Sequence, residues 1–482
     1  MSKNLKRTKL IATLGPASSN RETMIELIKA GVDVFRINFS HADYDLVRKN
    51  VETIREINKD FGYSVGILGD LQGPKLRVGV VKEGSYLNQG DILTFTNEEI
   101  EGDSTRVYMT YQQFPKDVKV GERILIDDGK LVLEVVETNE KDTVKAKTIQ
   151  GGVLSSKKGV NLPNTNVSLP ALTKKDIQDA NFMLDLELDW IALSFVRHAQ
   201  DIIDLKELIH NHPKGKNFKT PIIAKIEKPE GVKNIDEILE YCDGLMVARG
   251  DLGVEVPMEE VPAIQKNLVA KARAYAKPVI IATQMMETMI NSLTPTRAEV
   301  NDVANSVLDG ADAVMLSGET SVGKYPVEVV KNMTKIIKKA EDSEYYKNSI
   351  IATSDINHEN TDRFITDRIC LAAVRIAKTT NVEAIITMTY SGYSAMRISS
   401  YRPNAHIIVY SSNKRVITML NLIWGVRAFF YDLQKSTDET IIQVNTLTYH
   451  NGFVQQGDIV VNINATPVYE GGKTNTLRLT TI

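Results

Sequence analysis

The sequence predicts an α/β protein built on a closed (β/α)8 TIM barrel, with an inserted β-rich lid domain and a C-terminal α/β domain. Two observations predict the barrel: eight short apolar segments alternate with amphipathic segments, and the apolar segments are almost continuously hydrophobic. Strands of a parallel sheet that is covered on both faces have this composition. Eight strand–helix units are the number that closes such a barrel. A doubly wound open sheet stays an alternative, because periodicity alone does not show closure.

The expected elements divide the chain into three sections. The barrel strands are expected at 8–14, 32–40, 64–70, 190–196, 221–227, 243–249, 277–283 and 311–317. The helices are expected at 21–30, 43–60, 174–188, 199–210, 231–240, 259–276, 296–309 and 326–343. Residues 1–71 and 171–345 should therefore form the barrel. Residues 346–482 should form the C-terminal domain, because a polar stretch at 346–362 precedes strands expected at 384–389, 406–411, 426–430 and 458–463.

Residues 72–170 have a different pattern of hydrophobic residues. Its apolar runs are short and alternate with polar residues, as in Ile124–Ile126 and Leu131–Val136, which flank Asp127-Asp128-Gly129. Asp-Gly between alternating apolar residues is a strong hairpin signal. We therefore expect a small β-rich lid domain inserted between the third and fourth strands of the barrel.

The composition argues against several classes of function. The 482 residues are 43% hydrophobic and carry a net charge of −3, without a separate block of Lys and Arg, so we expect no nucleic acid and no membrane as a partner. The basic N-terminus is followed by Gly15 and Pro16, which leaves too short an apolar run for a signal peptide. Cys242 and Cys370 lie in apolar segments and are expected to be free thiols in a reducing, cytoplasmic compartment.

Polar residues gather at the C-terminal ends of the expected strands, where barrel enzymes carry their chemistry. These residues are Arg36, Asn38, Ser40, Asp70, Lys225, Glu227, Arg249, Gly250, Asp251, Thr283, Ser317 and Glu319. Each one alone is best explained as a solvated or salt-bridged loop residue. Buried charges are costly unless they are paired or bound to a ligand, so polar residues from six strands at one mouth indicate a binding site.

The residue types favour phosphoryl transfer. The carboxylates Glu227 and Asp251 can hold one hard divalent cation such as Mg²⁺ or Mn²⁺. The cations Arg36, Arg249 and Lys225 can balance a phosphate and a carboxylate on the substrate. Phosphoryl transfer requires a metal ion and fixed positive charge around the transferring group, with little covalent help from the protein.

Seven segments, in order, carry a family resemblance. They are Arg7–Ser18 (RTKLIATLGPAS), Phe35–His41 (FRINFSH), Ser156–Pro163 (SKKGVNLP), Ala224–Glu227 (AKIE), Met246–Leu252 (MVARGDL), Ala282–Met285 (ATQM) and Met315–Thr320 (MLSGET). These segments resemble motifs of the pyruvate kinases, and the resemblance extends over nearly the whole length of the chain. The resemblance implies transfer of a phosphoryl group from phosphoenolpyruvate to ADP, giving pyruvate and ATP in the final ATP-forming step of glycolysis. It also implies a cytoplasmic homotetramer.

The resemblance also implies roles for single residues. Lys225 is similar to the lysine that stabilises the phosphoryl group in transfer, and Arg36 to the arginine that binds its phosphate. The remaining implied sets are Glu227 and Asp251 for the divalent metal; Arg249, Gly250, Asp251 and Thr283 for the substrate; Asn38, His41, Arg77 and Lys158 for the nucleotide; and Asn38, Ser40, Asp70 and the Leu71 carbonyl for a monovalent cation. Thr283 together with a water is a candidate proton donor to enolpyruvate, but the sequence does not assign the donor.

One departure from the family pattern concerns K⁺. The commoner pattern after the strand-3 aspartate is Thr, Lys and then Gly-Pro-Glu, whereas this chain has Leu71, Gln72 and then Gly-Pro-Lys, ending at Lys75. The chain thus resembles the subgroup that works without K⁺. Replacing Glu with Lys changes the local charge by two units, each worth about 1.5 kcal/mol at about 10 Å and an effective dielectric near 20. We expect the Lys75 ammonium to make K⁺ dispensable; the alternative is that Lys75 faces solvent and K⁺ still binds.

Two loops of the C-terminal section resemble an effector site for a phosphorylated small molecule. The first follows a strand and opens a helix, with Ser391, Gly392 and Ser394, and the second contains Gly472 and Thr474. Backbone N–H groups at a helix start suit a phosphate. A Ser-rich helix cap is the alternative, since Tyr393 replaces an arginine found in some family members.

Two rival functions remain open at this point. Metal-dependent barrels that make or cleave enolates also use carboxylates and arginines, although they have no evident need for a lid carrying Arg77 and Lys158. A non-catalytic sensing homologue would normally lack Lys225, Glu227, Asp251 or Thr283, and all four are present.

Overall fold

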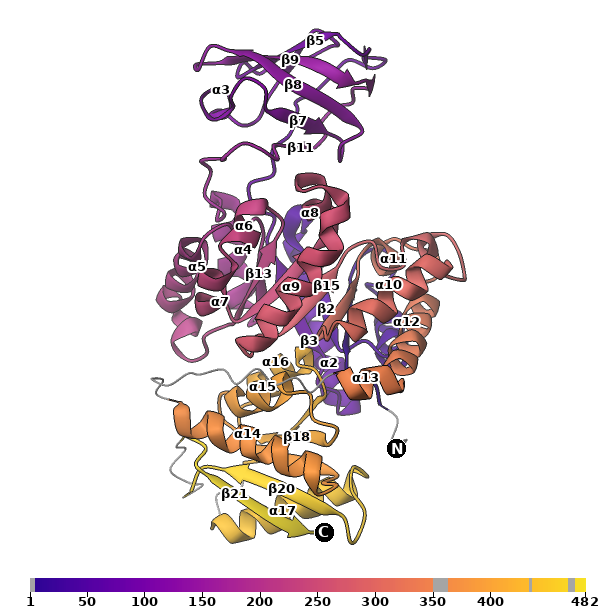
Figure 1. Cartoon of the computed structure of the whole chain (residues 1–482), viewed down its shortest axis with the longest axis vertical. Helices are drawn as coiled ribbons and strands as arrows, with labels where there is room; N and C mark the ends of the chain where they lie inside the picture. Colours follow the sequence, from indigo (N-terminus) through magenta and orange to yellow (C-terminus); the bar gives the residue numbers. More distant parts are fainter. Residues whose placement is uncertain (1–4, 350–362, 433–435, 467–472) are drawn as a thin grey trace.

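Eight parallel strands close into a barrel in the computed structural model, which describes residues 5–349, 363–432, 436–466 and 473–482 (Figure 1). The strand order around the ring is β1-β16-β15-β14-β13-β12-β3-β2. The bounds are β1 Lys9–Thr13, β2 Val34–Asn38, β3 Gly66–Asp70, β12 Trp190–Leu193, β13 Ile222–Ile226, β14 Gly244–Ala248, β15 Val279–Ala282 and β16 Ala313–Leu316. The closure confirms the predicted (β/α)8 barrel and excludes the doubly wound sheet.

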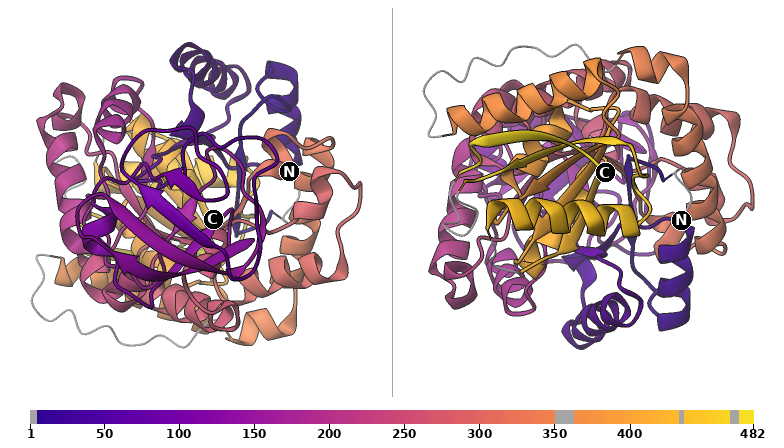
Figure 2. Two further views of the ribbon diagram at one scale, coloured as in Figure 1. Left: turned by 90° about the horizontal axis from the view of Figure 1, so that it is seen from above. Right: turned by 90° about the horizontal axis from the view of Figure 1, so that it is seen from below.

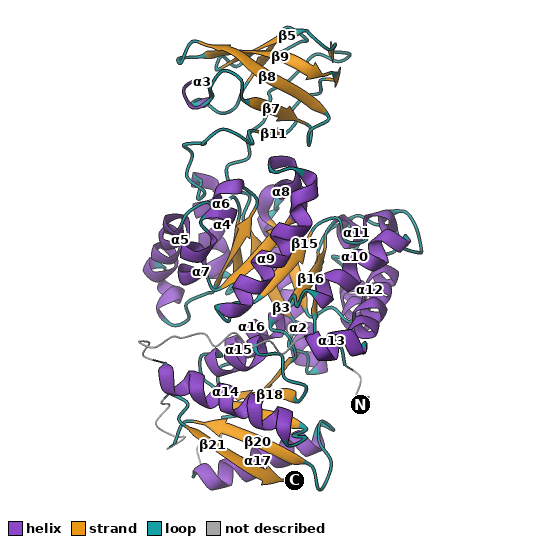
Figure 3. Ribbon diagram, viewed as in Figure 1, coloured by secondary structure: helices purple, strands orange, loops and turns teal. Residues whose placement is uncertain are grey.

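Helices surround this ring of strands (Figure 3). They are α1 Arg21–Ala30, α2 Tyr44–Phe61, α4 Lys174–Asp185, α5 Ala199–Asn211, α6 Pro229–Lys233, α7 Ile235–Tyr241, α8 Arg249–Glu255, α9 Val261–Ala274, α10 Arg297–Leu308, α11 Gly318–Ser321, α12 Pro326–Glu341 and α13 Glu344–Ser349. The helix expected at 231–240 is divided at Asn234, whose side-chain amide donates to the Arg197 carbonyl at 2.9 Å. Residues 249–255 form a short helix that the sequence analysis assigned to the end of a strand and a loop.

The lid stands over one end of the barrel (Figure 1 and Figure 2, left). Its strands are β4 Tyr86–Leu87, β5 Ile92–Thr96, β6 Arg106–Tyr108, β7 Arg123–Ile126, β8 Leu131–Thr138, β9 Thr143–Gln150, β10 Gly152–Val153 and β11 Val160–Asn161, with the short helix α3 Phe114–Asp117. Strands β7 and β8 form the predicted hairpin, and both turn aspartates, Asp127 and Asp128, adopt positive φ angles. A separate hydrophobic core lies within this sheet.

The C-terminal section contains a five-stranded sheet in the order β19-β18-β17-β20-β21. Its elements are α14 Phe364–Thr379, β17 Ala384–Met388, α15 Tyr393–Ser400, β18 His406–Ser411, α16 Lys414–Met419, β19 Val426–Phe430, α17 Thr437–His450, β20 Ile459–Asn464 and β21 Thr476–Thr481. Strand β21 was missed by the sequence analysis. The section packs under the barrel (Figure 2, right), where the Arg402 guanidinium pairs with Asp312 at 2.8 Å.

The boundaries between the three domains remain predictions from the sequence. They are residues 1–71 with 171–345 for the barrel, 72–170 for the lid and 346–482 for the C-terminal domain. Among the described residues, no helix has the length and apolar character needed to cross a membrane.

Candidate active site

A buried ammonium group lies at the centre of the barrel mouth. Lys225, on β13, places its Nζ 3.1 Å from Asp70 Oδ1, 3.0 Å from Glu227 Oε1 and 2.6 Å from Ser194 Oγ. Burial lowers the pKa of Lys225, but the charges of Asp70 and Glu227 outweigh burial and raise it above its ordinary value. The side chain therefore stays cationic.

Glu227 is buried at the end of β13, and one of its oxygens accepts a hydrogen bond from the backbone N–H of Phe195 at 2.7 Å. Burial, with a further contribution from the charge of Asp251, raises the pKa of Glu227 to about 7 despite the neighbouring Lys225. A carboxylate that is buried near a second carboxylate is costly, and a divalent cation between the two would relieve that cost. The donor set therefore fits a hard cation bound through oxygen. No group of three or more His, Cys, Asp or Glu residues able to hold a metal occurs among the described residues, so such an ion would depend on two carboxylates and the substrate.

Arg36 and Asp70 form a second ion pair at the same mouth. Arg36, on β2, donates from Nε and Nη2 to Asp70 Oδ2, each at 2.7 Å, and from Nη1 to Thr13 Oγ1 at 3.1 Å. Burial raises the pKa of Asp70, but Lys225 and Arg36 outweigh burial and lower it. One buried carboxylate thus orients two cations toward a single point, which is suitable for an anionic ligand.

The loop after β15 has a strained backbone. Thr283 and Gln284 both have positive φ angles, 68° and 52°. The Thr283 hydroxyl accepts the backbone N–H of Gly250 at 2.7 Å and donates to the Ala282 carbonyl at 2.6 Å. Such conformations cost of order 1–3 kcal/mol each and persist only where the surroundings impose them. Thr283 is therefore held beside the start of α8, next to Gly250.

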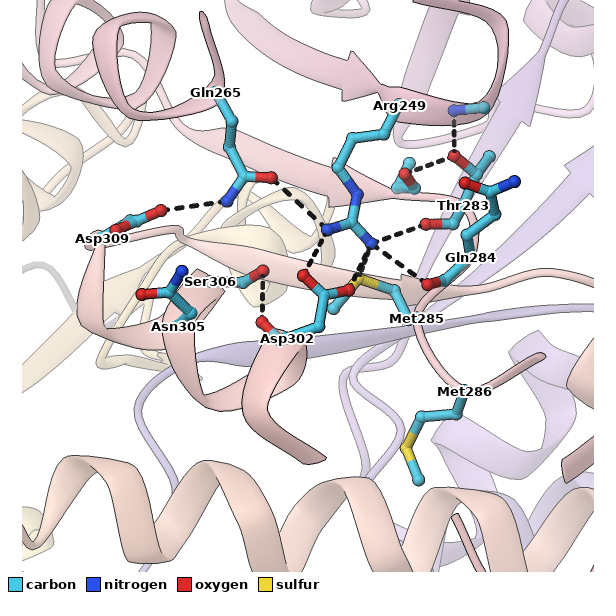
Figure 4. A network of polar contacts seen from close by, with 12 residues as sticks. Arg249, Gln265, Thr283, Gln284, Met285, Met286, Asp302, Asn305, Ser306 and Asp309 are labelled. Carbon is cyan, nitrogen blue, oxygen red and sulfur yellow. Dashed lines mark hydrogen bonds and ion pairs between the residues drawn. The ribbon is translucent and has the colours of Figure 1, made fainter. Parts of the chain in front are cut away.

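Arg249 differs from the expectation that it faces the substrate. Its guanidinium makes a two-pronged contact with Asp302 on α10, at 2.6 and 2.7 Å, and donates to the carbonyls of Thr283 at 2.8 Å and Gln284 at 3.3 Å (Figure 4). Gln265 on α9 also contacts it at 3.5 Å. The residue begins a helix rather than ending a strand, which turns its side chain toward α10. Arg249 therefore supports the strained loop and does not join the cations beside Lys225.

Two lid cations lie next to each other. The Arg77 Nη1 group donates to the Lys157 carbonyl at 2.8 Å, and Lys158 forms an ion pair with Asp127 at 2.9 Å. A β-bridge between Arg77 and Gly159 brings them together. Both positions are far more solvated than those at the barrel mouth, since the Lys158 side chain is 38% exposed.

Lys75 is exposed on the segment that leads into the lid, and its Cε lies near Gly159. It lines the cleft between lid and barrel. The other lining residues include Asp128, Asn161, Phe195, Arg197, Lys228, Asp251 and Glu255. The other residues implied for a monovalent cation lie around the end of β2 and β3. Asn38 is exposed and accepts the backbone N–H of Ser40 at 3.1 Å, while the Leu71 carbonyl accepts the Ser194 hydroxyl at 2.7 Å.

Ser40 lies beyond the end of β2, in the short 3-10 helix Phe39–His41, although the expected strand extended to residue 40. The side chain of His41 is outside the described residues. Glu319 is also not part of the mouth, because its buried carboxylate accepts the backbone N–H groups of Met286 at 3.1 Å and Ser317 at 2.7 Å.

The two predicted effector loops meet in the C-terminal section. Ser394 and Thr474 are buried, and their hydroxyl oxygens lie 2.9 Å apart in a shared hydrogen bond. Gly392 precedes α15 with a φ of 83°, and Ser391 is exposed. Gly472 lies outside the described residues. The two loops are therefore in contact, and the binding of an effector between them remains a prediction.

The sequence analysis missed several groups that organise the site. Ser194, which follows β12, holds Lys225 and the Leu71 carbonyl together. The Phe195 N–H holds Glu227, and Phe195 itself has a positive φ of 56°. Ser194 carried the signal available in the sequence, since this hydroxyl residue interrupts the otherwise apolar strand expected at 190–196.

Comparisons with known proteins agree over the whole chain. Residues 5–330 match the family model described as "Pyruvate kinase, barrel domain", and residues 367–480 match "Pyruvate kinase, alpha/beta domain". A pyruvate kinase of Mycobacterium intracellulare is 42% identical over 98% of this chain and 98% of its own length. A pyruvate kinase of Bacillus licheniformis is 42% identical over 98% of this chain and 80% of its own length.

The structural comparison gives the same result. The crystal structure of a pyruvate kinase from Cryptosporidium parvum superposes with a TM-score of 0.92 at 35% sequence identity, covering 99% of this chain and 96% of that one. The closed barrel, the inserted lid and the C-terminal α/β section are thus shared along almost the full length. The chain is a phosphotransferase that belongs to the pyruvate kinase family.

Proposed function

We propose that this protein transfers the phosphoryl group of phosphoenolpyruvate to ADP, forming pyruvate and ATP in the final ATP-forming step of glycolysis. The observation that carries the proposal is the buried Lys225 ammonium, held between Asp70 and Glu227 at the barrel mouth. A fixed cation in a site from which water is excluded stabilises charge on a transferring phosphoryl group without reorganising. The family membership supports the same reaction.

Lys225 and Arg36 supply the positive charge in this proposal. Both contact Asp70 on β3, Lys225 from β13 and Arg36 from β2, so a phosphate entering the mouth meets two cations whose positions are already fixed. Because the pKa of Lys225 is raised, the ammonium keeps its proton while the phosphoryl group moves. The donor and acceptor oxygens of the reaction need only be aligned, which is a positioning task.

Glu227 and Asp251 would hold the divalent cation, Mg²⁺ or Mn²⁺. When bound, such an ion would neutralise charge on the phosphate and act as a Lewis acid there. Burial, with a further contribution from the charge of Asp251, raises the pKa of Glu227, and a bound cation would relieve the cost of keeping this buried carboxylate ionised. Gly250 and Thr283, which are joined by a hydrogen bond of 2.7 Å, would together with Asp251 bind the carboxylate and methylene end of the substrate.

Arg77 and Lys158 would bind the nucleotide phosphates from the lid, with Asn38 and His41 as further nucleotide contacts. Closure of the lid over ADP would exclude water from the cleft. We further propose that the enzyme is a cytoplasmic homotetramer, that Lys75 makes K⁺ dispensable at the site of Asn38, Ser40, Asp70 and Leu71, and that Ser391, Gly392, Ser394, Gly472 and Thr474 bind a phosphorylated effector.

The reaction is tested by following ATP and pyruvate together in purified protein supplied with phosphoenolpyruvate, ADP and Mg²⁺. We expect both products in equal amounts, and neither when ADP is omitted or Mg²⁺ is removed with EDTA. Pyruvate formed without ADP would contradict the proposal and favour a lyase-type barrel enzyme. Neither product under any condition would favour a non-catalytic homologue.

A further inference from the structure

Glu255 is a buried carboxylate with no part in the proposed chemistry. It is the last residue of α8, the helix that carries Asp251 in its first turn. Its Oε1 accepts hydrogen bonds from Lys228 Nζ at 2.7 Å and from Asn161 Nδ2 at 2.8 Å. The Glu255 side chain is 0% exposed, and its Oε2 has no hydrogen-bond partner. A buried carboxylate held through one oxygen is costly, so its position calls for an explanation.

The contact joins three separate segments of the chain. Lys228 follows Glu227 directly and precedes α6. Glu255 lies one turn after Asp251 on the same short helix. Asn161 belongs to β11 at the edge of the lid sheet. The Lys228–Glu255 ion pair therefore links the two segments that carry the proposed metal ligands, and the amide of Asn161 connects both to the lid.

The lid is attached to the barrel in two other places, both within its connecting segments. The outgoing segment is fixed where the Gly73 N–H donates to Asp176 at 3.1 Å, and the returning segment is fixed where Arg197 donates to two backbone carbonyls. Apart from these attachments, and within the described ranges of the chain, the Asn161–Glu255 contact is the one hydrogen bond from the lid sheet to the barrel. This contact gives a change in lid angle a direct route to the end of α8.

We propose that Asn161, Glu255 and Lys228 are positioning residues that couple the lid to Glu227 and Asp251, so that a divalent cation binds more tightly when the lid contact is made. The inference rests on the proposed function in taking those two carboxylates as metal ligands. A helix of two turns is stiff, so a shift of the carboxylate at its end moves the aspartate in its first turn. Coupling between two binding events is reciprocal, and a bound cation therefore also favours the lid position that makes this contact.

The test is the binding of Mn²⁺ to the full chain, measured by electron paramagnetic resonance as the concentration of free ion, without substrates. Asn161→Ala removes the lid contact from a half-buried position, and we expect the dissociation constant to rise about fivefold, because hydrogen bonds to charged groups are among the stronger ones. The matched control is Asn97→Ala, which removes an amide hydrogen bond of 2.8 Å to the Gln112 carbonyl inside the lid. Equal Mn²⁺ affinity in Asn161→Ala, Asn97→Ala and the unchanged protein would overturn the proposal.

A second measurement tests whether the coupling passes through Glu255. In a Lys228→Met background, Asn161→Ala should weaken Mn²⁺ binding less than twofold, because the carboxylate is already displaced. Lys228→Arg keeps the charge and should restore most of the fivefold effect of Asn161→Ala. Strictly additive effects of Asn161→Ala and Lys228→Met would contradict a shared path.

ATP formation in the unchanged protein is measured separately, which distinguishes the two proposals. ATP formation with equal Mn²⁺ affinities overturns the coupling alone. Unequal affinities without ATP formation overturn the reaction and leave the coupling standing. Failure of the unchanged protein to bind Mn²⁺ contradicts both.

Discussion

The barrel mouth and the lid carry positive charge in different ways. Lys225 at the mouth is 11% exposed and contacts two carboxylates and a hydroxyl, whereas Lys158 on the lid is 38% exposed and contacts one carboxylate. Holding a charge in a buried place requires partners that also fix its direction. A solvated charge needs no such partners, and its side chain keeps its conformational freedom. Under the proposed function, the group to be transferred would be held at the mouth, and the lid would adapt to the nucleotide.

The largest expected effect is that of Lys225→Met. Loss of a fixed cation at a transferring group should lower kcat by about 10²–10³ or more. The matched control is Lys9→Met, because Lys9 is also fully buried but lies at the other end of the barrel, where Nζ donates to the Val426 carbonyl at 2.9 Å. Steady-state kinetics and thermal unfolding are measured for both variants, so that loss of turnover at the barrel mouth is distinguished from loss of stability at the opposite end of the barrel. Normal turnover in Lys225→Met would remove the role assigned to this lysine.

The next effect concerns the support of the strained loop. Asp302→Asn leaves the Arg249 guanidinium without its charged partner, and we expect kcat/KM to fall about 10- to 100-fold because Thr283 shifts. The free energy of unfolding should fall by about 2 kcal/mol. Asp60→Asn is the control, since Asp60 accepts Arg21 at 2.6 Å in an ion pair that shares no residue with this network. Equal kinetics in the two variants would mean that the mouth does not depend on this network.

A smaller effect is expected on the lid. Lys158→Met should raise the KM for ADP about tenfold, because one phosphate contact is lost, while the melting temperature stays within about 2 °C, since an exposed ion pair contributes only about 0–1 kcal/mol. Lys145→Met, which breaks another exposed lid ion pair, with Glu137 at 2.9 Å, is the control. A large fall in kcat at saturating ADP would show that the lid charge acts on the transfer itself.

The smallest expected effect is that of K⁺ on the unchanged protein. We expect activity in sodium or Tris buffer to lie within about twofold of that in K⁺, since Lys75 adds a local positive charge. Lys75→Glu should make the rate depend on K⁺. A large gain on adding K⁺ to the unchanged protein would support the alternative that the exposed Lys75 faces solvent.

The sequence predicted the barrel well because its strands are buried on both faces and their apolar runs are nearly continuous. The expected strands 64–70 and 221–227 differ from β3 and β13 by at most two residues at either end. Strand β21 was missed because its residues are largely exposed and alternate polar Thr and Arg with Leu477 and Leu479. The alternation covers only six residues, which is a short signal beside the continuous apolar runs of the barrel strands.

The direction in which a single side chain points could be predicted from the sequence only for residues on strands, where successive side chains alternate between the two faces. The residues of β13 point in alternate directions, so Lys225 and Glu227 had to share one side. The contacts of Arg249 could not be predicted from the sequence, because the start of α8 and the position of Asp302, 53 residues along the chain, determine where its guanidinium lies. The Asn161–Glu255 contact was equally hidden, since it depends on how the lid sits on the barrel.

The most direct measurement is a crystal structure with Mn²⁺ and a phosphoenolpyruvate analogue, in which anomalous scattering locates the metal. The account predicts one metal peak within coordination distance of Glu227 and Asp251, with the Lys225 ammonium in contact with the phosphate-mimicking group of the same ligand. A metal peak elsewhere, or an analogue bound away from Lys225, would contradict it.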